Sequence, residues 1–165
     1  MSESKQKVST RLATGDDEAF LFDLFSSTRP EFDLLGLPDN QKQALMTMQF
    51  NAQRQQYDET YPASESRIIL SDSRLIGRIL VDRAESEITL IDIALMPENR
   101  NAGIGTALIQ ELLSQAAGSK KSVRLHVLKS NPALRLYERL GFSRAGDQSM
   151  YYEMICEPDS RPQVK

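Results

Sequence analysis

The chain has 165 residues, of which 40% are hydrophobic and 26% charged, and its 20 basic and 23 acidic side chains give a formal net charge of −3. This length and composition suit one globular domain, which we expect over 9–157, between polar tails over 1–8 and 158–165. The nearly balanced charge gives no electrostatic reason to expect nucleic acid or an anionic membrane as a partner.

Residue counts and apolar runs exclude further classes of protein. A single cysteine, Cys156, excludes an internal disulfide, and with only His126 besides it a Cys/His metal site is not expected. No apolar stretch approaches the ~20 residues of a membrane-spanning helix, and the polar N-terminus is unlike a signal peptide. We therefore expect a cytoplasmic protein without a bound metal.

The spacing of apolar residues predicts alternating strands and helices, separated by segments rich in Pro and Gly. In chain order we expect a strand over 9–13, a helix capped by Thr14 or Asp16, a loop over 26–40, a helix over about 41–57, a hairpin of 67–70 with 75–82, a strand over 87–95, a helix from about 103 to 116, a strand over 123–128, a helix over 131–141, and short antiparallel strands over 142–144 and 149–156. This order is typical of an α/β domain.

Residues 100–105 read Arg-Asn-Ala-Gly-Ile-Gly and lie between a predicted strand and a predicted helix. The start of a helix offers unpaired backbone N–H groups and the positive end of the helix dipole, which suit a phosphate group. Gly103 and Gly105 have no Cβ atom, so a diphosphate can approach their backbone closely. The segment is therefore predicted to bind a phosphorylated ligand.

Three glycine-loop motifs compete for this segment. A P-loop requires a lysine after its last glycine, and none follows Gly105. A dinucleotide-binding motif requires a third glycine where Leu108 stands. The third motif, Arg/Gln-x-x-Gly-x-Gly/Ala, is satisfied by Arg100, Gly103 and Gly105. An ordinary glycine-rich helix start is the alternative to all three.

A second motif occupies residues 131–142, Asn-Pro-Ala-Leu-Arg-Leu-Tyr-Glu-Arg-Leu-Gly-Phe. Asn131 at the N-cap, Pro132 at the first helical position and Gly141 after the last turn predict a short helix. Tyr137 lies on the apolar side of this helix, so packing in the core is the alternative to a chemical role for its hydroxyl group.

Together the two motifs make the chain resemble the GNAT acetyltransferase superfamily. The glycine loop is similar to the pyrophosphate loop of that family, and 131–142 resembles its segment Asn-x-x-Ala-x-x-x-Tyr-x-x-x-Gly-Phe. One departure is that the alanine stands at Ala133, one residue early, with Leu134 in its usual place. The motifs follow the family's order, and the resemblance extends from Thr10 to Cys156.

The resemblance implies a fold and a cofactor. The fold is an α/β domain with a central mixed, mostly antiparallel sheet, splayed between its fourth and fifth strands and flanked by about four helices. The acyl donor is acetyl-CoA, with a longer acyl chain left open, and the backbone N–H of Leu95 polarises its thioester carbonyl. The residues implied to bind this cofactor are Ile93, Ala94, Leu95, Arg100, Asn101, Ala102, Gly103, Ile104, Gly105, Thr106, Asn131 and Ala133.

Two side chains are expected to take part in catalysis. The resemblance places at Tyr137 the tyrosine that protonates the leaving thiolate. No family motif identifies the base that accepts a proton from the attacking amine. Glu87 is our first choice, because two-residue alternation places it on the same face of its strand as Leu95. Asp92, His126 and a water molecule are the alternatives.

The sequence thus predicts an N-acetyltransferase that moves the acetyl group of acetyl-CoA to a primary amine by direct attack. We expect a small metabolite or a peptide N-terminus as acceptor, because residues 26–62 mix charged and aromatic side chains. A homodimer is a further option. An acyl-CoA sensor or partner-regulating module without significant catalysis, and a nucleotide-binding α/β domain, are the competing classes.

Overall fold

The computed structural model describes residues 7–159, and the predicted polar tails lie almost entirely outside the described residues. The chain divides into two compact units. Unit 1 contains the chain up to Leu80 together with Ile93–Ala102, and unit 2 contains Val81–Asp92 together with the chain from Gly103 onward. The prediction of one domain over 9–157 stays a prediction.

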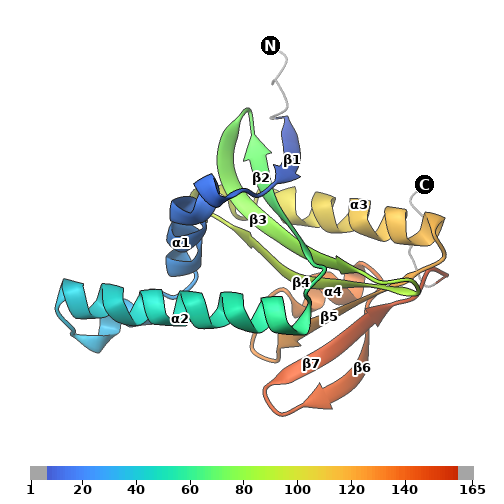
Figure 1. Ribbon diagram of the computed structural model, residues 1–165. Coiled ribbons are helices and arrows are strands. Elements are labelled where there is room, and N and C mark those ends of the chain that lie inside the picture. The colour runs from blue at the N-terminus through green and yellow to red at the C-terminus, as the bar shows by residue number, and fades with distance from the viewer. Residues whose placement is uncertain (1–6, 160–165) are drawn as a thin grey trace. The chain divides into compact units, whose positions relative to one another are not determined.

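The described residues alternate between strands and helices (Figure 1). In chain order these are β1 (Val8–Leu12), the 3-10 helix η1 (Gly15–Asp17), α1 (Glu18–Ser27), the 3-10 helix η2 (Pro30–Leu35), α2 (Asp39–Thr60), β2 (Glu65–Ser71), β3 (Arg74–Arg83), β4 (Glu87–Leu95), the 3-10 helix η3 (Pro97–Asn99), α3 (Ile104–Gly118), β5 (Ser122–Leu128), α4 (Leu134–Arg139), β6 (Ser143–Gln148) and β7 (Tyr151–Cys156).

The strands form a seven-stranded sheet in the order β1-β2-β3-β4-β5-β7-β6. The pair β4–β5 is parallel, whereas β1–β2, β5–β7 and β6–β7 are antiparallel. Together with four α-helices among the described residues, this mixed, mostly antiparallel sheet confirms the predicted fold class.

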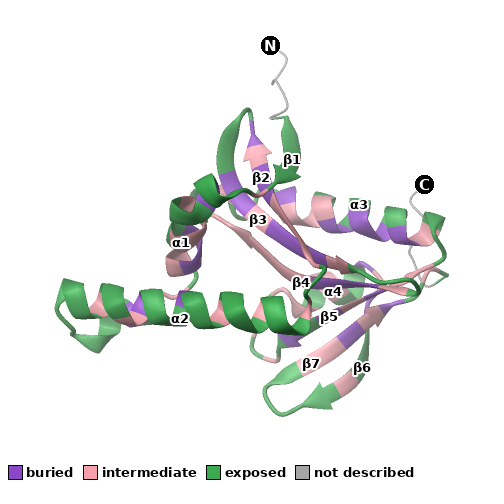
Figure 2. Ribbon diagram, viewed as in Figure 1, coloured by how far each residue is buried: buried purple, intermediate pink, exposed green. Residues whose placement is uncertain are grey.

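In unit 1, α1 and α2 pack against each other around an aromatic cluster. The buried side chains of this cluster are Phe25, Phe32, Met46 and Phe50. The Phe50 ring meets the Phe25 ring edge-on, with the centroids 5.4 Å apart. The remainder of α2 is mostly exposed (Figure 2), so this cluster is what holds the long helix to its unit.

The structure corrects two expectations in this region. Residues 30–35 were expected in a loop but form η2, because Pro30 sets a helical φ at its start and Phe32 is buried. The second helix was expected over about 41–57 but extends over Asp39–Thr60. The added residues are polar and therefore carry no apolar spacing, and the helix ends two residues before Pro62.

The entrance to α1 is fixed by a buried carboxylate. Thr14, and not Asp16, is the N-cap of η1, and its backbone N–H donates to the Asp17 carboxylate at 2.8 Å. Both oxygens of Asp17 also accept hydrogen bonds from Arg11 at 2.8 Å, and the side chain of Asp17 is only 5% exposed. These bonds lower the pKa of Asp17 to about 2, below its ordinary value of 3.8.

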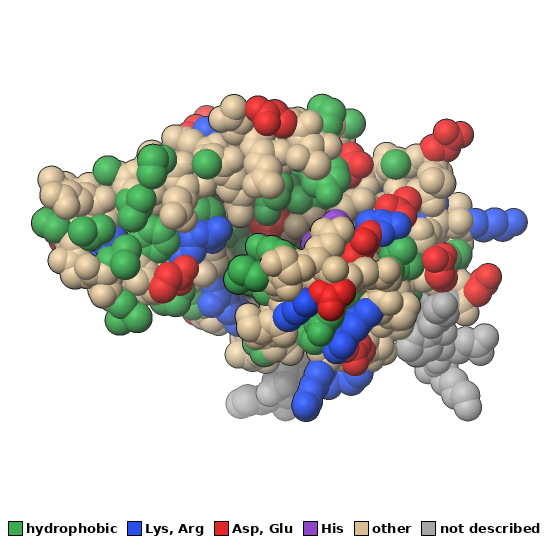
Figure 3. Space-filling model, turned by 90° about the horizontal axis from the view of Figure 1, so that it is seen from below, with side chains coloured by type: hydrophobic (Ala, Val, Ile, Leu, Met, Phe, Trp, Pro, Cys, Tyr) green, Lys and Arg blue, Asp and Glu red, His purple; other side chains and the backbone are tan. Residues whose placement is uncertain are grey.

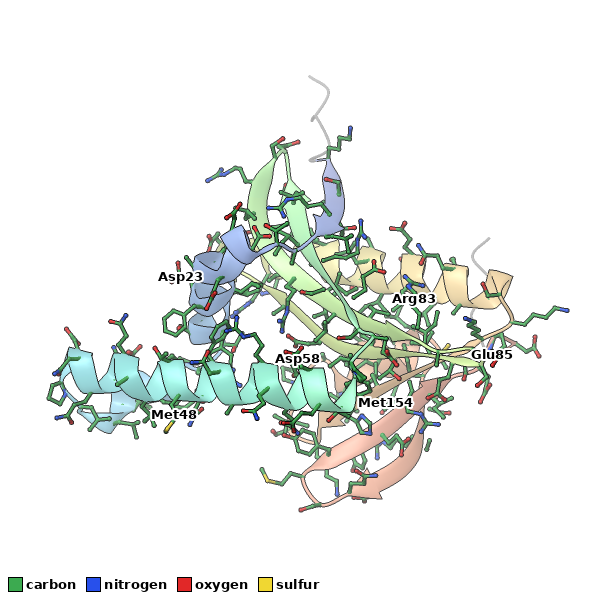
Figure 4. All side chains as sticks on the ribbon, viewed as in Figure 1. Asp23, Met48, Asp58, Arg83, Glu85 and Met154 are labelled. Atoms are coloured by element: carbon green, nitrogen blue, oxygen red, sulfur yellow. The ribbon has the colours of Figure 1, made fainter. Side chains whose placement is uncertain are left out.

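In unit 2, one face of β5 and β7 packs under α3. The register pairs Leu125 with Met154 and Val123 with Cys156, and all four side chains are buried. The buried side chains of α3 recur at helical spacing, as the sequence predicts, and are Ile104, Ile109, Leu112, Leu113 and Ala116. Met154 lies within this packing, whereas Met48 projects from α2 of unit 1 (Figure 4).

The last helix is shorter than expected. The sequence places its start at Asn131, but α4 covers Leu134–Arg139 with Ala133 as N-cap. The carboxamide oxygen of Asn131 accepts a hydrogen bond from the Ala133 N–H at 2.9 Å, and the Asn131 carbonyl accepts one from the Leu134 N–H at 3.1 Å. Asn131 therefore closes a turn that leads into α4, instead of capping the helix itself.

Candidate active site

The pairing of β4 with β5 stops before either strand ends. The parallel register runs from Glu87 with Ser122 to Leu90 with Leu125. Beyond the last pair, β5 continues to Leu128 while still pairing with β7, and β4 continues to Leu95. The splay that the sequence predicts between the fourth and fifth strands therefore begins after Leu90.

The glycine loop leads into α3 as the sequence predicts. Gly103 is the N-cap residue with a φ of 80°, a left-handed conformation that side chains with a Cβ rarely adopt. Gly105 and Thr106 lie in the first turn of α3 and are half-buried. The first backbone N–H groups of this helix, which belongs to unit 2, form the kind of site that binds phosphate.

Arg100 contacts the end of β4 within unit 1. Its Nε donates a hydrogen bond to the Leu95 carbonyl at 2.9 Å, and its Nη2 contacts Ser27 Oγ at 3.4 Å. Its own backbone N–H donates to the Pro97 carbonyl at 3.3 Å. The side chain of Arg100 thus holds the peptide group that follows Leu95.

Tyr137 is a half-buried side chain of unit 2. Its ring packs edge-on against Phe142, with the centroids 5.8 Å apart. Burial first, and the negative charge of Asp92 second, raise the pKa of Tyr137 above its ordinary value of 10. Alternation along β4 places Asp92 on the same face as Leu90, which is the buried face of the sheet. With its pKa raised above 10, the phenol of Tyr137 is protonated at neutral pH.

Glu87 carries an ion pair that sequence reasoning missed. Its two oxygens accept hydrogen bonds from Nε and Nη2 of Arg124 at 2.8 and 3.1 Å. Arg124 also forms an ion pair with Glu153 of β7, so one guanidinium joins carboxylates from two other strands. The signal for this network in the sequence is a single charge, Arg124, between apolar residues of β5.

His126 lies on the same face of β5 as Arg124, by two-residue alternation. It is exposed, and the antiparallel register places it directly opposite Glu153. His126 follows Leu125, the last residue of β5 that pairs with β4. The chain's one histidine thus stands where the two strands part, on the face opposite to Asp92.

Arg29, at the start of η2, and Arg54 of α2 stack on the aromatic cluster of unit 1. The guanidinium of Arg29 lies 3.7 Å from the centroid of Phe25, and that of Arg54 lies 5.3 Å from the centroid of Phe50. Near the start of α2, Figure 3 shows hydrophobic side chains at the surface. The most exposed of these in η2 and α2 are Leu34, Leu35 and Met48.

Residues 7–159 contain no group of three or more His, Cys, Asp or Glu side chains that could hold a metal ion. Over the same range, no helix has the length and apolar character needed to cross a membrane.

The fold and the glycine loop agree with a comparison to protein families. The model of the acetyltransferase (GNAT) family matches residues 21–142, which is most of the chain. The chain belongs to the GNAT family of acetyltransferases.

Two individual proteins are similar to parts of this chain. The ribosomal protein bS18 alanine N-acetyltransferase of Haemophilus influenzae is 31% identical over 87 residues, which are 51% of this chain and 58% of that protein. The cysteine-rich protein 2-binding protein of Homo sapiens is 39% identical over 66 residues, which are 40% of this chain and 8% of that protein. The match thus spans little more than half of the first relative.

Solved structures share the fold at low identity. PaiA N-acetyltransferase from Thermoplasma acidophilum, in complex with coenzyme A, has a TM-score of 0.68 at 17% identity and covers 92% of this chain and 99% of its own. Spermidine N-acetyltransferase from Vibrio cholerae, in complex with CoA and spermine, has a TM-score of 0.63 at 18% identity, with 93% and 96% covered. At these identities the likeness establishes the fold.

Proposed function

We propose that this chain is an N-acetyltransferase that transfers the acetyl group of acetyl-CoA to a primary amine by direct attack. The observation that carries the proposal is the match of residues 21–142 to the acetyltransferase (GNAT) family, and Tyr137 is the proposed proton donor. A leaving thiolate requires a proton donor, and a tyrosine with a raised pKa is protonated throughout the neutral range.

The proposed cofactor contacts follow the family resemblance. The N–H groups from Asn101 to Thr106 bind the diphosphate, with Gly103 leaving room for its approach. The backbone of Ile93–Leu95 binds the pantetheine arm, with Arg100 acting through the peptide that it holds. Asn131 and Ala133, at the turn into α4, complete the set of residues.

The base has two candidates on one face of the sheet. Glu87 remains our predicted base, although both of its oxygens accept hydrogen bonds from Arg124. One of these hydrogen bonds must break before Glu87 can accept a proton from the amine. His126 is the alternative, because it is exposed and follows the last β4–β5 pair. The imidazole of histidine is the side chain that most often acts as a general base.

The proposed acceptor is a small amine or a peptide N-terminus. The name of the Haemophilus influenzae relative describes an enzyme that acetylates an alanine of a ribosomal protein, which favours the peptide N-terminus. The exposed apolar side chains of η2 and α2 would suit an acceptor with an apolar part. We also propose a cytoplasmic location, and a homodimer remains an option.

Release of CoA in the presence of different amines tests this function. The panel should contain amino acids, polyamines, aminoglycosides and short peptides with free or blocked N-termini. We expect transfer to one class at a rate well above acetyl-CoA hydrolysis. Tight CoA binding without transfer to any amine would indicate the sensor instead. Binding of ATP or NAD in preference to CoA would indicate a nucleotide-binding domain.

A further inference from the structure

Gly77 of β3 lies directly beneath a peptide group of β4. A Cβ atom added to Gly77 would lie 2.2 Å from the Ala94 carbonyl oxygen and 3.2 Å from the Ala94 carbonyl carbon. Because a C=O bond is about 1.23 Å long, the oxygen is nearer by most of a bond length. The Ala94 carbonyl oxygen therefore faces the place that a Cβ atom added to Gly77 would occupy, and only a residue without a side chain permits this approach.

The orientation of this carbonyl fixes that of the Leu95 N–H. The peptide between Ala94 and Leu95 is planar and trans, so its N–H points opposite to its C=O. The Leu95 N–H is therefore directed away from Gly77 and away from β3. This is the donor that we propose for the thioester carbonyl.

The next peptide is fixed from both sides. The Met96 N–H donates to the Ile76 carbonyl of β3 at 2.7 Å. The Leu95 carbonyl accepts from Arg100 Nε at 2.9 Å, on the side of β4 away from β3. The N–H and C=O of Leu95 thus lie on the same side of the strand, as in any extended residue. Arg100 fixes the carbonyl on that side through its hydrogen bond.

We propose that Gly77 and Arg100 are positioning residues that aim the Leu95 N–H at the thioester oxygen. Gly77 allows the Ala94 carbonyl to turn toward β3, and Arg100 keeps the Leu95 carbonyl turned to the other side. Two neighbouring peptide groups with fixed directions give a donor that needs no rearrangement when charge develops, which is the condition for oxyanion stabilisation. This inference rests on the proposed acetyl transfer and deepens it.

The transfer step defines what this donor does. The amine nitrogen forms a bond to the thioester carbon, and the electron pair of the C=O bond moves onto oxygen, where the Leu95 N–H stabilises it. The C–S bond then breaks as the C=O bond forms again. The base receives the ammonium proton, and the CoA thiolate receives a proton from Tyr137. Only the donor to the oxyanion depends on Gly77.

The Gly77→Ala variant tests the proposal, with Gly118→Ala as a matched control. Gly118 is an exposed glycine at the end of α3, and a Cβ there would meet nothing within 4 Å. For Gly77→Ala we expect kcat to fall by about ten- to a thousandfold, because the Ala94–Leu95 peptide must move. The Kd for free CoA, which has no acyl carbonyl, should stay within about twofold of wild type, as should both values for Gly118→Ala.

The loss of kcat in Gly77→Ala, compared with its loss of CoA affinity, decides whether the proposal holds. A folded Gly77→Ala protein with wild-type kcat, or with losses of kcat and CoA affinity in equal measure, overturns the proposal. Failure of the wild-type protein to bind CoA or to acetylate any amine would instead refute the proposed function. The two failures are therefore distinguishable.

The Arg100→Met variant tests the same proposal if the Gly77→Ala protein does not fold. Loss of the Nε donor leaves the Leu95 peptide unheld, so kcat should fall by a larger factor than the affinity for free CoA. If Arg100 bound the diphosphate directly, the Kd for free CoA would rise and kcat at saturation would be kept, which contradicts the proposal. Adding Leu95→Ala to Gly77→Ala removes the 2.8 Å contact with Leu95 Cδ2, and should restore stability more than kcat.

Discussion

Arg124 on β5 donates hydrogen bonds to both carboxylate oxygens of Glu87 on β4 and forms an ion pair with Glu153 on β7. The side chains of Glu87 and Arg124 are 29% and 28% exposed, so water reaches the pair. Because Arg124 also pairs with Glu153, its guanidinium is held in place, and it fixes the position of the Glu87 carboxylate. The same two hydrogen bonds use both oxygens of Glu87. Any role for Glu87 as a base must compete with this bidentate pair.

The choice of base predicts different effects for two variants. If Glu87 is the base, Glu87→Gln should lower kcat by about 10²–10⁴-fold and His126→Gln should change it little. If His126 is the base, the effects of the two variants on kcat are exchanged. Steady-state kinetics of both variants from pH 5 to 10, with Glu153→Gln as a control for the ion-pair network, would separate the candidates. Equal, small effects of both variants would point to Asp92 or to a water molecule.

Binding of CoA should depend on the start of α3. Gly105→Glu places a side chain and a negative charge in the first turn of the helix, where we propose the diphosphate. We expect the CoA affinity, measured by calorimetry, to fall by at least about tenfold. Gly118→Glu, at the other end of α3, makes the same change of charge and should leave the affinity unaltered. A folded Gly105→Glu protein with wild-type affinity would refute the phosphate site.

Removal of the Tyr137 hydroxyl should lower turnover more than stability. Tyr137→Phe keeps the edge-on contact with Phe142 and removes only the proton donor, so kcat should fall by about 10²–10⁴-fold. Because burial and the charge of Asp92 raise the pKa of Tyr137, ionisation of this phenol should lower the wild-type rate only in the strongly alkaline range. Tyr151→Phe, at an exposed position of β7, is the matched control. A lower melting temperature with unchanged kcat would assign Tyr137 to the core alone.

Asp17 should make stability depend on pH in the acid range. Its pKa is about 2 in the folded protein and 3.8 ordinarily, so its carboxylate stabilises the fold above about pH 4 and stops doing so as the pH falls through 2. Asp17→Asn should therefore lower the melting temperature at pH 7, and the difference from wild type should shrink below pH 4. The neighbouring exposed residue offers the control Asp16→Asn. A difference that is independent of pH would exclude the ion pair with Arg11 as its cause.

Elements bounded by strong local signals are predictable from this sequence. The fourth strand begins at Glu87 and ends at Leu95, as expected, because an apolar run is limited by polar residues on one side and Pro97 on the other. The start of α3 is equally well marked by Gly103. The end of α2 is less well marked, because the residues between Tyr57 and Pro62 are mostly polar and apolar spacing stops at Tyr57.

The contacts that organise the candidate site are not predictable in the same way. The ion pair between Arg124 and Glu87 depends on the β4–β5 register, which residues far apart in the sequence determine together. Gly77 is recognisable in the sequence, because an isolated glycine inside a strand often marks a place where another part of the backbone comes close. Its partner, the Ala94 carbonyl, lies on another strand and required the structure.

The register shift between Arg144 and Gly146 affects how this protein meets copies of itself. β6 is the last strand of the sheet, and a free edge can pair with another chain. Here the edge is six residues long, irregular at Ala145, and carries the charges of Arg144 and Asp147. Each of these features hinders the addition of a further strand. We therefore expect that β6 does not pair with a strand of another copy, even at high protein concentration. A dimer, where one forms, should use another surface.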